Sequence, residues 1–218
     1  MADWFIATEG VKVVKDSVSL WPQIVTAISS IGAALGGVCL AHHYTRSREE
    51  KAASARREAE LYFISTELVF RLERFAQECA AVVQDEGEED ARGYTRVTAS
   101  AEPFAPDDIA GDWRVLPGKI LYRIRELTVL FAEANRYISY VNEYDSPPDW
   151  QCTFQERRYQ YARLGMKATL LSKRLRKLNR MPSSRLDASE WSAQSVLWEQ
   201  WRKGRKRRAK LAREHEDL

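Results

Sequence analysis

Hydrophobic positions near the N-terminus form one long uncharged run. Residues 17–45 contain no Asp, Glu, Lys or Arg, and residues 24–41 within them are mostly apolar. Trp21 and Tyr44 bracket the run at a spacing of 23 residues, or about 34 Å along a helix. A bilayer core about 30 Å thick needs about 20 apolar residues, and aromatic side chains favour its two interfaces. The pattern predicts a transmembrane helix over 21–44.

Two other interpretations of this run stay open. Thr26, Ser29, Ser30 and three glycines make it only moderately apolar, as in a buried core helix. The small residues around Ala41 could mark the cleavage site of a signal peptide, although the preceding segment is long and carries charges of both signs.

Arg and Lys residues are concentrated after the run. The positive-inside rule therefore predicts a single-pass protein of a bacterial inner membrane, with its N-terminus outside and its C-terminus in the cytoplasm.

Beyond residue 46 the apolar positions repeat every three or four residues, a period typical of helices that bury one face. Three such stripes are visible. The first comprises Leu61, Ile64, Leu68, Leu72, Phe75, Cys79 and Val82. The second comprises Ile120, Ile124, Leu127, Phe131, Ala134, Ile138 and Val141. The third comprises Tyr161, Leu164, Ala168, Leu171, Leu175 and Leu178. The steps of three and four are those of coiled-coil packing. We expect Leu127, Phe131, Leu171 and Leu175 to be buried where the helices meet.

Local signals place the ends of these helices. The stripes predict helices over 59–84, 118–143 and 154–180, the second opened by Pro117-Gly118. Thr153 and Glu156 have the spacing of a capping box. Asp187 and Glu190 have the same spacing before a last helix, which would carry the tryptophans Trp191, Trp198 and Trp201.

These observations predict an all-α fold, in which one N-terminal transmembrane helix precedes a cytoplasmic antiparallel bundle of three or four helices. The expected organisation follows the chain in six parts. They are a short extracytoplasmic N-terminus (1–20), the transmembrane helix (21–44), a juxtamembrane segment with the first bundle helix (45–85), an acidic loop (86–117), the remaining bundle helices (118–201) and a basic C-terminal tail (202–218).

The acidic loop does not fit the helical pattern. Tyr94–Thr98 could form a short strand, but we expect a mobile connection. Charge is unevenly distributed here, since residues 85–112 hold nine acids and two bases, whereas 154–180 hold nine bases and one acid. We favour pairing between the loop and the helix over a basic face that binds an anionic partner.

Small residues are regularly spaced inside the predicted span. Gly32 and Gly36 form a G-x-x-x-G pattern beside a second row of small residues, and small side chains let two helix backbones approach closely in lipid. The sequence therefore predicts a transmembrane homodimer whose contact residues are Ser29, Gly32, Ala33, Gly36 and Gly37.

The C-terminal tail is densely basic, with eight bases and no acid in twelve residues, and we expect it to fray past Gly204. Three roles are open for it: a solvated tail, contact with an anionic lipid leaflet, or nucleic-acid binding. Trp198 and Trp201 just upstream favour lipid over nucleic acid. The predicted anion-contacting residues are Arg202, Lys203, Arg205, Lys206, Arg207, Arg208, Lys210 and Arg213.

Residues suited to catalysis are sparse. The histidines are His42, His43 and His215, and the cysteines form no C-x-x-C pair. Cys39 and His42 lie one helical turn apart, too few ligands for a metal site within one chain. We therefore expect no enzyme, no cofactor and no metal. The sequence favours a membrane-tethered helical interaction or scaffold protein with an unknown protein partner. The alternative is a tethered binder of nucleic acid or another anionic ligand through residues 154–180 and the tail.

Overall fold

A computed structural model describes the backbone of residues 21–184, 189 and 192–216, and the side chains of residues 37–184, 189 and 192–214. The chain divides into two units, residues 1–54 and residues 55–218. The first unit is helical wherever it is described. The second unit holds the helical bundle and all the contacts discussed below.

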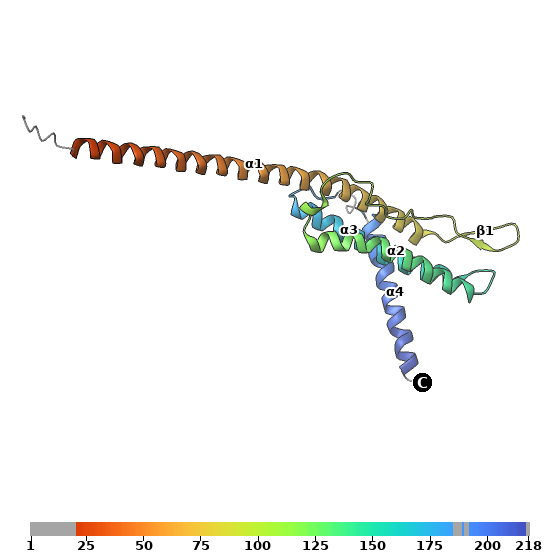
Figure 1. The fold of residues 1–218 in the computed structure, drawn as a ribbon. Helices are drawn as coiled ribbons and strands as arrows, with labels where there is room; N and C mark the ends of the chain where they lie inside the picture. Colours follow the sequence, from red (N-terminus) through yellow and green to blue (C-terminus); the bar gives the residue numbers. More distant parts are fainter. Residues whose placement is uncertain (1–20, 185–188, 190–191, 217–218) are drawn as a thin grey trace, which may run out of the picture. The chain divides into compact units, whose positions relative to one another are not determined.

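The described structure is almost entirely helical, as predicted (Figure 1). Short strands and a 3₁₀ helix, η1, occur only between α1 and α2 within the described residues. In chain order the elements are α1 (Trp21–Gln84), β1 (Glu88–Glu89), β2 (Thr95–Arg96), η1 (Trp113–Val115), α2 (Gly118–Glu143), α3 (Gln151–Leu178) and α4 (Ala193–Glu216). The predicted helix over 118–143 matches α2 at both ends.

The three apolar stripes form the core, which confirms their helical assignment. The core positions Leu127, Phe131, Leu171 and Leu175 are all buried, as predicted. Leu178 is the exception, because it ends α3 and is 41% exposed. Phe131 lies at the centre, with its ring 5.9 Å from Phe75 and 6.0 Å from Tyr161. One aromatic side chain thus joins α1, α2 and α3.

The connection after α1 is bonded to α3 and to α1 at several points, although its acidic composition suggested a mobile loop. Its anchor is Asp85, whose side chain is 1% exposed and pairs with Arg157 of α3 at 2.9 Å. The Asp85 carboxylate also accepts hydrogen bonds from the backbone N–H groups of Gly87, Thr98 and Ala99 and from the Thr98 hydroxyl. Burial raises the pKa of Asp85, but these hydrogen bonds outweigh burial and hold the pKa well below its usual range. The predicted pairing between the acidic loop and α3 is therefore present at this buried site.

A strand of two residues is present within Tyr94–Thr98, where the sequence favoured an irregular connection. Thr95 and Arg96 form β2 and pair with β1 in an antiparallel hairpin. Asp90 stabilises its turn by accepting backbone hydrogen bonds from Arg92 and Tyr94.

The same connection then returns along α1. The backbone N–H of Glu102 bonds to Glu78, and further on Ala105 bonds to Arg71. Gly111 lies against Ile64 with a φ of 137°, and a β-carbon at this position would lie 2.9 Å from the Ile64 side chain. Because the loop travels back before α2 begins, α2 runs in the same direction as the part of α1 beside it. The predicted antiparallel order therefore applies to α2 with α3 and to α3 with α4, but not to α1 with α2.

The start of α3 differs from the predicted capping box. The helix begins at Gln151, and the N–H of Thr153 donates to the Asp145 carboxylate at 2.7 Å. Glu156 instead accepts hydrogen bonds from Gln160 and Arg208. The capping pattern was misleading because a carboxylate outside the helix binds the exposed N–H. The second capping pattern, at 187 and 190, lies outside the described residues.

Candidate interaction site

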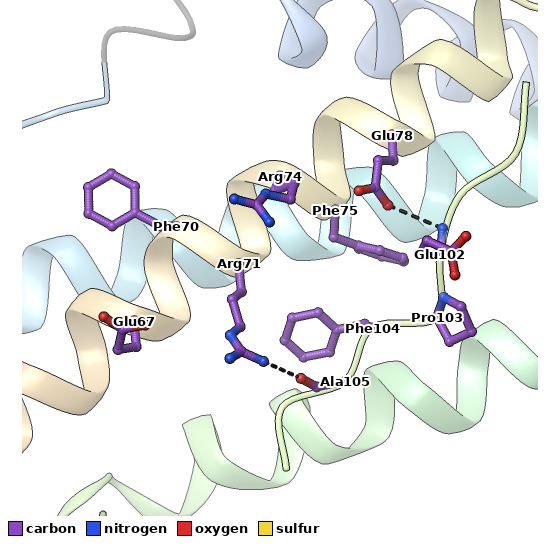
Figure 2. Close-up of a pocket in the computed structure, with 10 residues that line it drawn as sticks. All are labelled: Glu67, Phe70, Arg71, Arg74, Phe75, Glu78, Glu102, Pro103, Phe104 and Ala105. Atoms are coloured by element: carbon purple, nitrogen blue, oxygen red, sulfur yellow. Dashed lines mark hydrogen bonds between the residues drawn. The ribbon is translucent and has the colours of Figure 1, made fainter. Parts of the chain in front are cut away.

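A concavity of the bundle lies between α1 and the returning segment 102–105 (Figure 2). Its volume is about 540 Å³. Phe75 and Phe104 form its floor, both buried, with ring centroids 5.7 Å apart. This aromatic pair places apolar surface at the base of the groove.

Two contacts between side chain and backbone fix the groove's shape. Arg71 donates to the carbonyl oxygen of Ala105 at 2.9 Å, and Glu78 accepts from the N–H of Glu102 at 3.2 Å. Figure 2 shows these two contacts on either side of the aromatic floor. Because α1 and the segment are joined at both places, the groove is preformed.

The rim of the groove carries an exposed ring and two unengaged charges. Phe70 is 62% exposed, and the guanidinium of Arg176 lies 5.8 Å from its ring. Glu67 and Arg74 also line the groove, and neither has an ion pair or a side-chain hydrogen bond with another described residue. An aromatic centre with a charged rim is the composition of protein–protein interfaces.

A smaller hollow of about 50 Å³ lies between α2 and α3. Leu130 and Leu170 line it together with the bases Arg123, Lys167 and Arg174. On α3, Arg157 pairs with Asp85 and Arg176 pairs with Glu73, so these two bases are used internally. Part of the positive charge of α3 is therefore paired inside the protein, and the rest is left for an anionic partner. Among the bases of α3, all of them in the described part of the chain, those without an ion pair or a side-chain hydrogen bond are Arg163, Lys167, Arg174 and Lys177.

The basic tail is helical rather than frayed, since α4 continues to Glu216. Gly204 is buried against Tyr159 of α3. Arg207 donates to Gln155, and Arg208 pairs with Glu156. These two arginines are therefore engaged with α3, and the assignment of the eight tail bases as anion contacts stays a prediction. The exposed bases of the predicted set are Arg202, Lys203, Arg205, Lys206, Lys210 and Arg213.

The predicted membrane-spanning helix is not confirmed. No helix is long and apolar enough to cross a membrane within the residues that the structure describes. The side chains of residues 21–36, which make up most of the predicted span, lie outside them. The described remainder, residues 37–44, is short and includes His42 and His43 just before Tyr44. Of the predicted self-association residues, only Gly37 has described surroundings, and it has open space around it.

The described residues offer no assembled metal site, because no group of three or more His, Cys, Asp or Glu side chains lies close together among them. Burial raises the pKa of the Cys79 thiol far above its usual range, which leaves it protonated and unreactive. The absence of an enzymatic role stays a prediction.

Comparison with known proteins adds no relative: no protein-family model, curated protein or solved structure matches this chain.

Residues 102–105 were missed as groove residues because the sequence places them in a loop. The α1 side of the groove did carry a signal, since Phe70 is a large aromatic residue outside the apolar stripe of its helix.

Proposed function

We propose that this chain is a membrane-tethered helical interaction protein that binds a peptide segment of a protein partner in the α1 groove. The single observation behind this proposal is the preformed groove with a buried aromatic floor, an exposed Phe70 and unengaged charges at Glu67 and Arg74. A peptide with one apolar anchor and flanking charges of both signs complements such a surface.

Two features of the sequence support the tether and its pairing. The uncharged segment 17–45 is long enough to cross a bilayer as a helix. The excess of Arg and Lys after it favours a cytoplasmic bundle. The small-residue row of Ser29, Gly32, Ala33, Gly36 and Gly37 supports pairing of two copies in lipid.

The groove is tested by photo-crosslinking in cells. A photoreactive phenylalanine analogue at Phe70 is expected to yield an adduct with one partner protein, which mass spectrometry identifies. The same analogue at Tyr122, 66% exposed on α2, serves as the control and should not yield this adduct. The change Arg74→Glu reverses a rim charge and should reduce the Phe70 adduct about tenfold, because placing like charges opposite each other costs about 1.4 kcal/mol or more. Equal adducts from Phe70 and Tyr122, or an adduct indifferent to Arg74→Glu, would contradict the proposal.

The tether is tested by fractionation. The full chain is expected to stay in the membrane pellet after a carbonate wash at high pH. Changing Ile31 and Leu35 to Arg should release it, because each charge at the centre of a span costs about 2.5–3.5 kcal/mol. Immunoblotting of pellet and supernatant measures both. Wild-type chain recovered in the carbonate supernatant would disprove the tether.

A further inference from the structure

Helix α4 presents a dense cationic surface, here called the α4 basic face. It consists of six exposed bases: Arg202, Lys203, Arg205, Lys206, Lys210 and Arg213. At 100° per residue, the positions of these six bases cover a sector of about 160° of the helix circumference. The ion pairs of Lys203 with Glu199 and of Lys210 with Glu214 are exposed i,i+4 pairs, which contribute little. The face is therefore available to an external anion.

Contacts with α3 hold this face toward solvent. Leu197 is fully buried, and its side chain lies against Gly165 of α3, where a β-carbon would be 2.7 Å from it. About two turns later, Gly204 meets Tyr159, and the Arg208 guanidinium lies 4.1 Å from the centre of the same ring. The apolar side of α4 is thereby occupied, and the orientation of the helix about its own axis is fixed.

The last turns of α4 extend past these contacts. Every residue from 209 to 214 is exposed, including Leu211 at 48%. Figure 1 shows this end of α4 leading away from α3. A single helix is about 10–12 Å across with its side chains, and the major groove of duplex DNA is about 12 Å wide. The described end of α4 thus has the dimensions of a helix that enters this groove.

The distribution of charge favours duplex DNA over a membrane. A helix at a lipid surface needs an apolar face turned toward the acyl chains. The apolar side of α4 is buried against α3. On its exposed side, the Trp198 side chain is 45% exposed, and its ring stacks on the ring of Trp201. Cations spread over a wide sector can meet phosphates on both walls of a groove, whereas a flat bilayer reaches only one side. This evidence reverses the preference for lipid that the sequence suggested.

We propose that the α4 basic face binds the phosphate backbone of duplex DNA without reading its sequence. The exposed bases supply phosphate contacts, and no Asn or Gln stands among positions 201–214 to pair with an adenine edge. Binding rests on counterion release and falls steeply with salt. This surface is separate from the α1 groove and does not depend on the function proposed for it.

The test measures fluorescence anisotropy of a labelled 20-base-pair duplex with the full chain in neutral detergent. For four phosphate contacts, the affinity is expected to fall about 150-fold between 50 and 200 mM salt. The test variant combines Arg202→Gln, Lys206→Gln, Lys210→Gln and Arg213→Gln, and it should lose most of both the affinity and the salt dependence.

A matched control removes the same number of charges from the unpaired bases of α3, of which Arg174 and Lys177 are exposed and Arg163 and Lys167 half-buried. It combines Arg163→Gln, Lys167→Gln, Arg174→Gln and Lys177→Gln, and it should bind the duplex within about threefold of the unmodified chain. Circular dichroism checks that both variants keep their helix content. Equal losses in the two variants would overturn the proposal, since net charge alone would then explain binding. Tighter binding to mixed micelles containing phosphatidylglycerol than to the duplex would also overturn it.

Discussion

Replacing Asp85 with Asn is expected to lower the free energy of unfolding by about 3–5 kcal/mol, the range for breaking a buried ion pair. The substitution preserves the size of the side chain but removes the charge that Arg157 faces. The Arg157 side chain is only 10% exposed, so its guanidinium would stay buried without a carboxylate. The amide would also lose acceptor capacity for the backbone N–H groups of Thr98 and Ala99. Urea unfolding of the full chain followed by circular dichroism measures the loss.

Asp107→Asn is the matched control for this prediction. Asp107 also pairs with an arginine, Arg125, but its side chain is 71% exposed. Exposed pairs contribute about 0–1 kcal/mol, so this variant should unfold near the midpoint of the unmodified chain. Adding Arg157→Met to Asp85→Asn should cost less than the sum of the two single changes, because no buried charge is left. Equal losses from Asp85→Asn and Asp107→Asn would show that the loop is not anchored at Asp85.

The same carboxylate makes the stability of the bundle depend on pH. Although burial raises the pKa of Asp85, its hydrogen bonds lower the pKa further, so the folded value lies below the value of about 3.9 in an unfolded chain. The unfolded state therefore takes up the proton first as the pH falls. The contribution of Asp85 is complete above about pH 5 and declines below about pH 4. The difference in unfolding free energy between the unmodified chain and Asp85→Asn should shrink over that acidic range.

The helices could be predicted because their apolar positions are numerous and periodic. The stripe from Ile120 to Val141 lies between Pro117-Gly118 and Pro147-Pro148, and α2 begins and ends within these limits. Burial of Leu127 and Leu175 follows from the same period. Local sequence determines these features, since each turn of a helix repeats the pattern of the one before.

The returning loop could not be predicted because its order depends on distant partners. Asp85 binds Arg157, 72 positions away, and Glu60 accepts from the N–H of Asp112, 52 positions away. Nothing in the acidic composition of the loop distinguishes Asp85 from the other acids. The groove depends on the same long-range contacts, so its two sides could not be brought together from sequence.

Counting charges was equally insufficient for the basic tail. Arg207 and Arg208 have the same composition around them as Arg205 and Lys206, yet the first two contact α3 and the last two are exposed. The difference is the side of α4 on which each residue lies, because Gly204 packs against Tyr159 and turns one side of the helix toward α3. The sequence therefore gives the sign of the surface, whereas helix packing decides which bases belong to it.

Replacing Phe131 with Ala should lower the free energy of unfolding by about 3–5 kcal/mol, the usual cost of deleting a buried aromatic side chain. Phe131 is 8% exposed and meets Phe75 and Tyr161 edge-on, so its removal leaves a cavity where three helices join. Phe131→Leu retains most of the volume and should cost about 1.5 kcal/mol or less. Urea unfolding followed by circular dichroism gives all the values on one scale.

Val129→Ala supplies the control on the same helix, because Val129 is 63% exposed and its truncation should change the unfolding free energy by less than about 0.5 kcal/mol. Phe75 also forms the floor of the α1 groove, so loss of its packing partner Phe131 should change the shape of the groove. The Phe131→Ala chain, still folded at low temperature, is therefore expected to yield less of the Phe70 crosslink than the Val129→Ala chain. If Phe131→Ala and Val129→Ala unfolded at the same urea concentration, the aromatic junction of α1, α2 and α3 would be wrong, and the floor of the groove with it.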